Sequence, residues 1–149
     1  MKKEINIRNK KASFNYEFID KYTAGIVLTG TEIKAIRESK VSFTDSYCRF
    51  INKELWLIGI HISEYSYGSY NNHSPKRDRK LLLNKKELQK INKKIDEKGL
   101  TIVPVRLFIN DRGYAKIVIA VSRGKAKFDK RHDIKDRDNK RELDRYMKK

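Results

Sequence analysis

Two stretches of the sequence each read as a pair of strands joined by a short polar turn, and they restrict the fold more than any other feature. The first runs from Tyr47 to Ile62 and turns at Asn52-Lys53. The second joins 101–109 to 114–121 through the segment Asn-Asp-Arg-Gly at 110–113. Asn, Asp and Gly favour tight turns between strands. The sequence therefore predicts two β-hairpins.

Further strands are predicted ahead of the first hairpin. Apolar and polar residues alternate over 14–18 and again over 24–28, which is typical of half-buried strands. Pro104 lies inside the second hairpin and has no N–H to donate to a neighbouring strand. A bulge or a sheet edge is therefore expected at Pro104.

Two helices are predicted between the strands. The segment 29–32, Thr-Gly-Thr-Glu, has the spacing of a capping box, and its helix is expected to reach about Ser39. Asn84 is a natural N-cap with Glu87 three residues later, and Gly99 supplies the stop. This second helix has a hydrophobic staple and one apolar stripe, formed by Leu83, Leu88, Ile91 and Ile95.

The order of strands, helix and long hairpin favours a mainly β fold with flanking helices. We expect residues 1–121 to form a small closed barrel of the OB type, with the second helix plugging one end. Such barrels often bind single strands and RNA loops, but a fold alone does not establish a function.

Charge is concentrated in three blocks. The chain has 36 Lys and Arg against 19 Asp and Glu, a formal net charge of +17. Blocks 1–11, 76–98 and 122–149 carry almost all of this excess, and the remaining residues are nearly neutral. A strong positive field favours polyanions such as RNA, DNA or an anionic membrane.

Residues 122–149 form a basic C-terminal tail with few apolar side chains. Opposite charges fall four residues apart, as in Asp133/Arg137, which supports a helix only weakly. We expect this tail to be disordered in the free protein and to become helical, from about Asp133 to Met147, on a polyanionic partner.

Several classes of function are disfavoured. No apolar run has the length of a membrane-spanning helix, and the N-terminus has no signal-peptide core. Cys48 is the single cysteine, which fits a reducing cytoplasm. The three histidines lack metal-ligand spacing, and phosphate-binding glycine motifs are missing. We expect no metal, no cofactor and no enzymatic activity.

The segment 72–84 has the densest chemistry. Arg77 and Arg79 are expected to project on either side of Asp78, where their guanidinium groups suit phosphates. The leucines at 81–83 would anchor the following helix, and Asn84 would be both a helix cap and a polar contact.

Motifs along nearly the whole chain resemble the bacterial SsrA-binding protein family, also called small protein B. They begin at 9–12, Asn-Lys-Lys-Ala, and continue to the C-terminal residues. The matching motifs are Ala24-Gly25-Ile26, Gly30-Thr31-Glu32-Ile33-Lys34 with Arg37, Asp45-Ser46-Tyr47, His73 to Asn84, Gly124-Lys125, Asp129-Lys130-Arg131, Ile134-Lys135 and Arg137-Asp138. Each motif is weak alone, but their order and spacing are specific.

The resemblance implies a non-catalytic, monomeric protein that binds the tRNA-like end of transfer-messenger RNA and carries it into stalled ribosomes. The tail would occupy the decoding centre and the empty messenger channel. The implied RNA-binding residues of the body are Asn9, Lys10, Arg77, Arg79, Lys80, Leu82 and Asn84. The implied tail residues are Phe128, Asp129, Lys130 and Arg131 at the decoding centre, and Tyr146 and Met147 near the end of the tail helix.

The sequence departs from the family pattern at three positions. Thr23 stands where the family usually has Glu, Phe128 where it has Tyr or His, and Ala126 where it often has Lys. Two other functions stay open on the residues alone. A general RNA-binding or ribosome-associated protein would have the same basic blocks, and an RNA-processing enzyme would need a metal or a general base.

Overall fold

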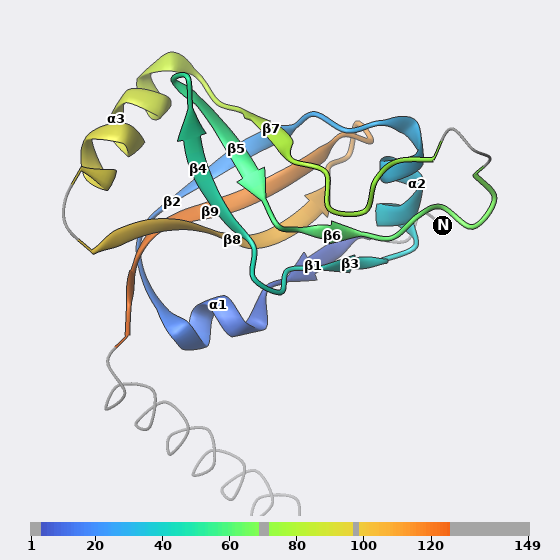
Figure 1. The fold of residues 1–149 in the computed structure, drawn as a ribbon, viewed down its shortest axis with the longest axis horizontal. Coiled ribbons are helices and arrows are strands. Elements are labelled where there is room, and N and C mark those ends of the chain that lie inside the picture. The colour runs from blue at the N-terminus through green and yellow to red at the C-terminus, as the bar shows by residue number, and fades with distance from the viewer. Residues whose placement is uncertain (1–3, 69–71, 97–98, 126–149) are drawn as a thin grey trace, which may run out of the picture.

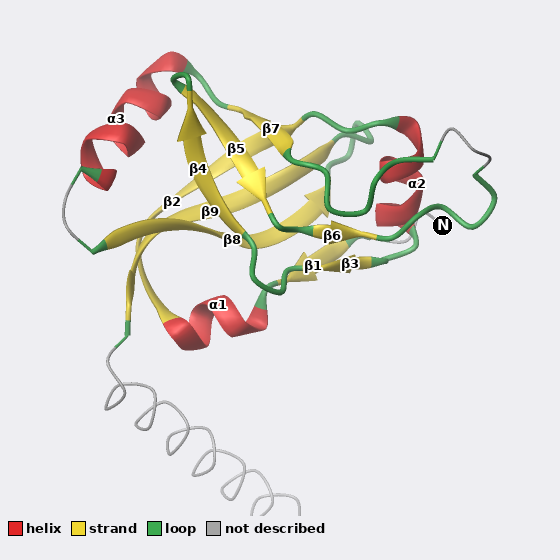
Figure 2. Cartoon of the chain, viewed as in Figure 1, coloured by secondary structure: helices red, strands yellow, loops and turns green. Residues whose placement is uncertain are grey.

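The computed structural model describes residues 4–68, 72–96 and 99–125 (Figure 1). Strands are its main secondary structure, and short helices lie at its edges (Figure 2). In chain order the elements are β1 Asn6–Arg8, α1 Lys10–Asn15, β2 Tyr16–Ile26, α2 Gly30–Arg37, β3 Val41–Ser42, β4 Tyr47–Ile51, β5 Glu54–Ile58, β6 His61–Ile62, β7 Arg79–Leu82, α3 Lys85–Ile95, β8 Leu100–Ile109 and β9 Ala115–Gly124.

Both predicted hairpins are confirmed. Strands β4 and β5 pair around Asn52 and Lys53, which have φ angles of 50° and 64°. Strands β8 and β9 pair around a turn in which the Gly113 N–H donates to the Asn110 carbonyl at 2.9 Å. The first hairpin is shorter than predicted, because the chain turns away at Gly59 (φ 81°) and β6 pairs with β3 instead.

The strand pairings run around a barrel. In order the neighbours are β8, β4, β5, β7, β2 and β9, and β9 pairs again with β8. The β4–β8 contact has one register pair, Cys48 with Ile102, whereas β2–β9 and β8–β9 run along most of their length. The expected OB-type architecture is therefore confirmed, but the barrel is not strictly closed.

Strand β2 is one continuous strand where the sequence predicted two. It runs from Tyr16 to Ile26 and pairs with β9, with an irregularity between Phe18 and Asp20. Phe14, assigned to a strand by alternation, instead lies in α1. That helix has six residues, so its apolar side chains do not show a helical period.

The bulge predicted at Pro104 is confirmed, since the register of β8 against β9 shifts between Pro104 and Arg106. The bulge also anchors α1. The Asn9 side chain donates to the Pro104 carbonyl at 2.9 Å, and the Asn9 backbone N–H donates to the Val105 carbonyl at 2.8 Å.

The two predicted helices are confirmed with their caps. The Thr29 side chain accepts from the Glu32 N–H, and the Glu32 carboxylate accepts from the Thr29 N–H at 2.9 Å. The Asn84 side chain caps α3 by accepting from the Glu87 N–H at 2.8 Å. Helix α3 inserts Ile91, which is fully buried, among the core side chains at one end of the barrel (Figure 1).

The two-part division of the chain stays a prediction. Strand β9 continues past residue 121, the predicted end of the body, and Ser122 is fully buried within it. The predicted tail helix and the tail residues Phe128, Asp129, Lys130, Arg131, Tyr146 and Met147 lie outside the described residues.

Candidate nucleic-acid interface

The expectation that Arg79 projects into solvent is wrong. Its side chain is fully buried at 0% exposure. Along β7, Arg79 and Leu81 face the interior of the barrel, whereas Lys80 and Leu82 face outward. The Arg79 guanidinium donates to the Ile60 carbonyl at 3.0 Å and to the Pro75 carbonyl at 3.1 Å. Arg79 is therefore part of the interior and holds the preceding loop to the barrel.

The ionic partner of Arg79 is Glu32, which is also fully buried. Arg79 Nε donates to Glu32 Oε2 at 2.5 Å, and Arg77 Nη2 donates to Oε1 at 2.6 Å. Burial raises the pKa of the Glu32 carboxyl, but the hydrogen bonds from Arg77 and from the Thr29 backbone, with the charge of Arg79, outweigh this effect. The pKa of Glu32 is therefore held below its ordinary value.

Arg77 is only partly available to a ligand. Its side chain is 36% exposed, and one face of the guanidinium is held by Glu32 and by the Val27 carbonyl at 3.3 Å. Its Nε is buried and has no hydrogen-bond partner among the described residues. Both arginines that were predicted to bind phosphate thus fix the loop that leads into β7.

His73 joins the same loop to α2. Its Nδ1 lies 2.9 Å from the Thr31 hydroxyl and its Nε2 lies 2.9 Å from the Ile62 carbonyl. A carbonyl can only accept, so Nε2 carries a proton and donates to Ile62, whereas the Thr31 hydroxyl can either donate to Nδ1 or accept from it. His73 therefore links α2, β6 and the loop.

The outward face of β7 carries the exposed part of the predicted site. Leu82 is 52% exposed, and Lys80 pairs with Glu54 at 3.1 Å on the surface. Leu82 lies directly opposite Gly25 in the neighbouring strand β2. An apolar side chain this exposed on a rigid strand is available for contact with a partner.

Gly25 has a packing role beside Leu82. A Cβ atom at Gly25 would lie 3.3 Å from the Leu82 Cβ and 3.7 Å from Lys116 Nζ. Because Gly25 has no side chain, Leu82 and Lys116 can both lie close to its backbone. Thr23 is exposed two residues earlier on β2, with its side chain on the same outer face.

Asn84 lies two residues after Leu82 in the chain and is the N-cap of α3, which begins at Lys85. It is exposed, and its cap hydrogen bond to the Glu87 N–H uses Oδ1. The first turn of α3 therefore holds Asn84 beside Leu82 in a fixed position. Lys80, Leu82, Asn84, Gly25 and Lys116 are called the β7 surface below.

Asn9 and Lys10 do not lie on the β7 surface. They begin α1, which leads into the Tyr16 end of β2, whereas Leu82 pairs near the Ile26 end (Figure 1). The Asn9 side chain is occupied as the N-cap of α1 and as a donor to Pro104, while Lys10 is exposed.

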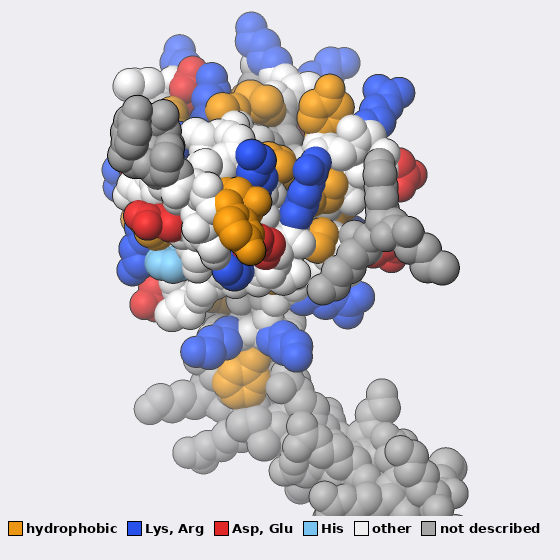
Figure 3. All heavy atoms as spheres, turned by 90° about the vertical axis from the view of Figure 1, so that its right-hand side faces the viewer, with side chains coloured by type: hydrophobic (Ala, Val, Ile, Leu, Met, Phe, Trp, Pro, Cys, Tyr) orange, Lys and Arg blue, Asp and Glu red, His pale blue; other side chains and the backbone are white. Residues whose placement is uncertain are grey.

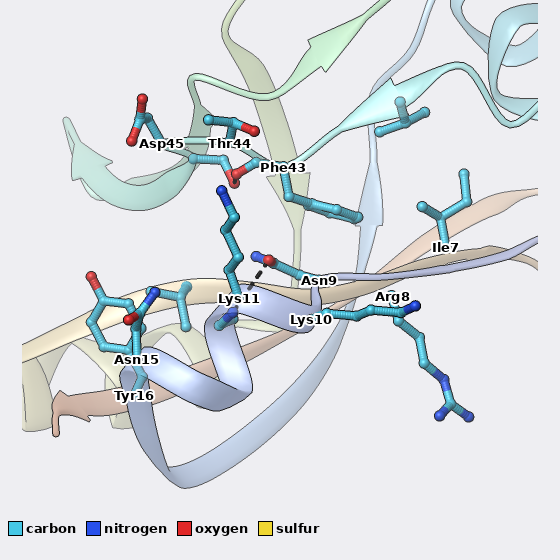
Figure 4. Close-up of a pocket in the computed structure, with 14 residues that line it drawn as sticks. Ile7, Arg8, Asn9, Lys10, Lys11, Asn15, Tyr16, Phe43, Thr44 and Asp45 are labelled. Atoms are coloured by element: carbon cyan, nitrogen blue, oxygen red, sulfur yellow. Dashed lines mark hydrogen bonds between the residues drawn. The ribbon is translucent and has the colours of Figure 1, made fainter. Parts of the chain in front are cut away.

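The α1 region has its own cavity of about 380 Å³, between α1 and the segment 43–46. Lys11 extends across it toward Phe43 and Asp45, while Arg8 points away (Figure 4). This cavity is separate from the β7 surface, so the structure brings together only part of the predicted RNA-binding set.

Sequence reasoning missed three outward-facing residues, two in the row of Lys80 and one opposite Gly25. Arg49 pairs with Trp56, and Trp56 pairs with Lys80, so these side chains form one row across β4, β5 and β7. Arg49 is exposed and Trp56 partly exposed. Lys116 on β9 is the third, after Arg49 and Trp56. The alternation within the two hairpins was the signal that could have found all of them.

Across 4–68, 72–96 and 99–125, no three His, Cys, Asp or Glu side chains gather in a way that could hold a metal ion. The helices in these ranges are all too short or too polar to cross a membrane.

Comparisons with known proteins find one family that matches nearly the whole chain. A family model described as SmpB protein matches residues 6–149. Curated proteins named SsrA-binding protein are similar, including one from Phocaeicola vulgatus (62% identical, covering 97% of this chain and 96% of that one) and one from Thermosipho africanus (49% identical, 94% of each). A chain from a solved structure on tmRNA-SmpB and the bacterial ribosome has a TM-score of 0.71 and 46% identity, and the match covers 83% of this chain and 86% of that chain.

Proposed function

Because the chain belongs to the SmpB family, we propose that it binds the tRNA-like end of transfer-messenger RNA through the β7 surface and delivers that RNA to stalled ribosomes. The observation that carries the proposal is the placement of Leu82. It is 52% exposed, lies against Gly25, and is followed directly by the cap of α3. This role places the protein in the cytoplasm.

The β7 surface has the chemistry for an RNA backbone and a base. Lys80, two residues before Leu82 on β7, and Lys116, whose Nζ lies over Gly25 opposite Leu82, supply positive charge. The Asn84 side-chain amide can donate to an RNA oxygen while its Oδ1 caps α3. Leu82 offers an apolar contact that distinguishes a splayed-out loop base from a stacked helix. The protein performs no covalent step, since peptidyl transfer belongs to the ribosome.

The tail completes the proposed role. Its basic residues would lie among ribosomal RNA phosphates in the messenger channel, with Asp129, Lys130 and Arg131 at the decoding centre and Phe128 stacked on a base. Tyr146 and Met147 would lie further along the tail helix. The family membership and the charge pattern support this assignment.

Binding of purified full-length protein to transfer-messenger RNA tests the β7 surface. We expect Leu82→Ala to weaken binding about 5-fold or more, because it removes a buried apolar contact in the complex. The matched control is Ile19→Ala, since Ile19 is 41% exposed on the same sheet near the opposite end of β2. Both variants should keep the wild-type unfolding midpoint.

An equally charged unrelated RNA separates specific from general binding. Wild-type protein should prefer transfer-messenger RNA, and Leu82→Ala should lose most of that preference. Equal affinity of the wild type for both RNAs would favour a general RNA-binding protein. Equal losses for Leu82→Ala and Ile19→Ala would show that the β7 surface is not the binding site.

A further inference from the structure

The loop between β6 and β7 carries an aromatic ring into solvent. Tyr67 is 85% exposed, and its described ring contact is with Tyr65, with centroids 5.7 Å apart and planes at 65°. One edge-to-face contact covers little of the ring, so a flat face of Tyr67 is open to solvent. The loop lies beyond α2, at the end of the molecule far from α3 (Figure 1).

The turn that carries Tyr67 is held by several hydrogen bonds. The Gly68 N–H donates to the Tyr65 carbonyl at 2.9 Å, which closes the turn 65–68. Asn72 Nδ2 donates to the same carbonyl at 2.8 Å, and Asn72 Oδ1 accepts from the Tyr65 N–H at 3.2 Å. A Cβ at Gly68 would lie 2.4 Å from Asn72 Nδ2, so glycine permits this close approach.

The turn is also tied to the rest of the fold. Lys40 Nζ donates to the Ser66 hydroxyl at 3.0 Å, and Asn72 precedes the buried His73 that links the loop to α2. A ring on a preorganised turn loses little further conformational entropy when it binds a partner. Tyr67 is thus placed for binding before a partner arrives.

Two lysines contact the turn. Lys34 Nζ lies 5.5 Å from the centroid of the Tyr65 ring, and Lys40 is the donor to Ser66 described above. The nearby acids are Glu38, which pairs with Lys40 at 3.2 Å, and the exposed Glu64. Figure 3 looks onto this end and shows hydrophobic side chains among Lys and Arg side chains.

We propose that the turn 65–68 is a second RNA contact, on which one unstacked base lies against the Tyr67 ring while Lys34 faces its phosphate. Open aromatic faces next to cations are the usual platforms for single-stranded or looped-out bases. The assignment rests on the proposed RNA-binding function. The base can come from transfer-messenger RNA or from ribosomal RNA, and these two sources require separate measurements.

Three Tyr67 variants test the stacking. Tyr67→Ala should weaken RNA binding about 5- to 150-fold, the effect of losing one stacked base. Tyr67→Phe keeps the ring and should bind like wild type, whereas Tyr67→Leu keeps apolar area without a flat ring and should resemble Tyr67→Ala. Since Tyr67 is exposed, all three should unfold at the wild-type urea concentration.

Salt dependence distinguishes the ring from the cation. Tyr67→Ala should leave the slope of log affinity against log salt unchanged, while Lys34→Ala should reduce it by about 0.7–0.9. Each protein is measured with isolated transfer-messenger RNA and with ribosomes stalled at a messenger end. A loss confined to one partner identifies the source of the base.

Two results would overturn the proposed stacking of a base on Tyr67. The first is wild-type affinity of Tyr67→Ala for both partners. The second is full retention of binding by Tyr67→Leu, which would indicate an apolar protein contact instead of stacking. The stacking contact and the RNA-binding function can fail separately. If only the stacking contact fails, wild type and Tyr67→Ala bind transfer-messenger RNA equally, and Leu82→Ala still binds it weakly.

Discussion

Glu32→Gln should destabilise the protein by about 3 kcal/mol. Three donors converge on the Glu32 carboxylate: the Thr29 N–H at 2.9 Å, Arg77 Nη2 at 2.6 Å and Arg79 Nε at 2.5 Å. Glutamine offers one oxygen and an NH₂ group, so one arginine would face a donor. Removing one partner of a buried ion pair costs about 3–5 kcal/mol.

The lower end of that range applies here because Arg79 keeps the Ile60 and Pro75 carbonyls as acceptors. Even so, about 3 kcal/mol is a large part of a typical stability of about 5–15 kcal/mol. Urea unfolding measures the effect, with the fluorescence of the single tryptophan, Trp56, as the signal. Glu54→Gln is the control, because the exposed Lys80–Glu54 pair should contribute at most about 1 kcal/mol.

The pH dependence gives a second check on Glu32. Its pKa is lowered on folding, so its contribution to stability is complete above its ordinary pKa of about 4.5. The contribution is lost as the pH falls below that value and through the folded pKa. The difference between wild type and Glu32→Gln should therefore shrink below pH 4.5. The reasoning is refuted by a difference no larger than that of Glu54→Gln at neutral pH, or by one that stays constant under acid.

Two further changes probe the turn and the tail. Lys53→Gly should stabilise the protein by about 0.5–1 kcal/mol in urea unfolding, because Lys53 has a φ of 64° that glycine adopts without a steric penalty; a loss of stability would contradict this. Lys130→Ala combined with Arg131→Ala should keep transfer-messenger RNA binding but block peptide tagging on ribosomes stalled at a messenger end, and normal tagging would exclude the proposed decoding-centre role.

Local signals in the sequence were enough to predict the turns and caps. The Asn52-Lys53 turn, the Thr29–Glu32 capping box and the Asn84 cap depend on residues within a few positions of one another. The bulge at Pro104 follows from one missing N–H. These features are predictable because the chemistry that causes them is contained in one short segment.

Features set by distant contacts were not predicted. Helix α1 is capped by Asn9, whose side chain also bonds to Pro104 far along the chain. The burial of Arg79 depends on Glu32, which sequence reasoning assigned only to a helix end. A charged side chain is usually exposed, so no local pattern indicated that this arginine pairs inside the barrel. Of the predicted residues, Lys80, Leu82 and Asn84 therefore stay in the candidate site, Arg79 leaves it because it is buried, and Lys116 is added to it.

Strand β2 connects two distant parts of the molecule. Gly25, near one end, lies beside Leu82, and Tyr16, at the other end, pairs with Gly124. The next residue, Lys125, donates its N–H to the carbonyl of Asn15 in α1 at 2.9 Å. Nine strand residues of about 3.3 Å each separate the two ends by about 30 Å. The β7 surface at Leu82 and the backbone at Lys125 are therefore kept at a fixed spacing that a flexible linker could not maintain.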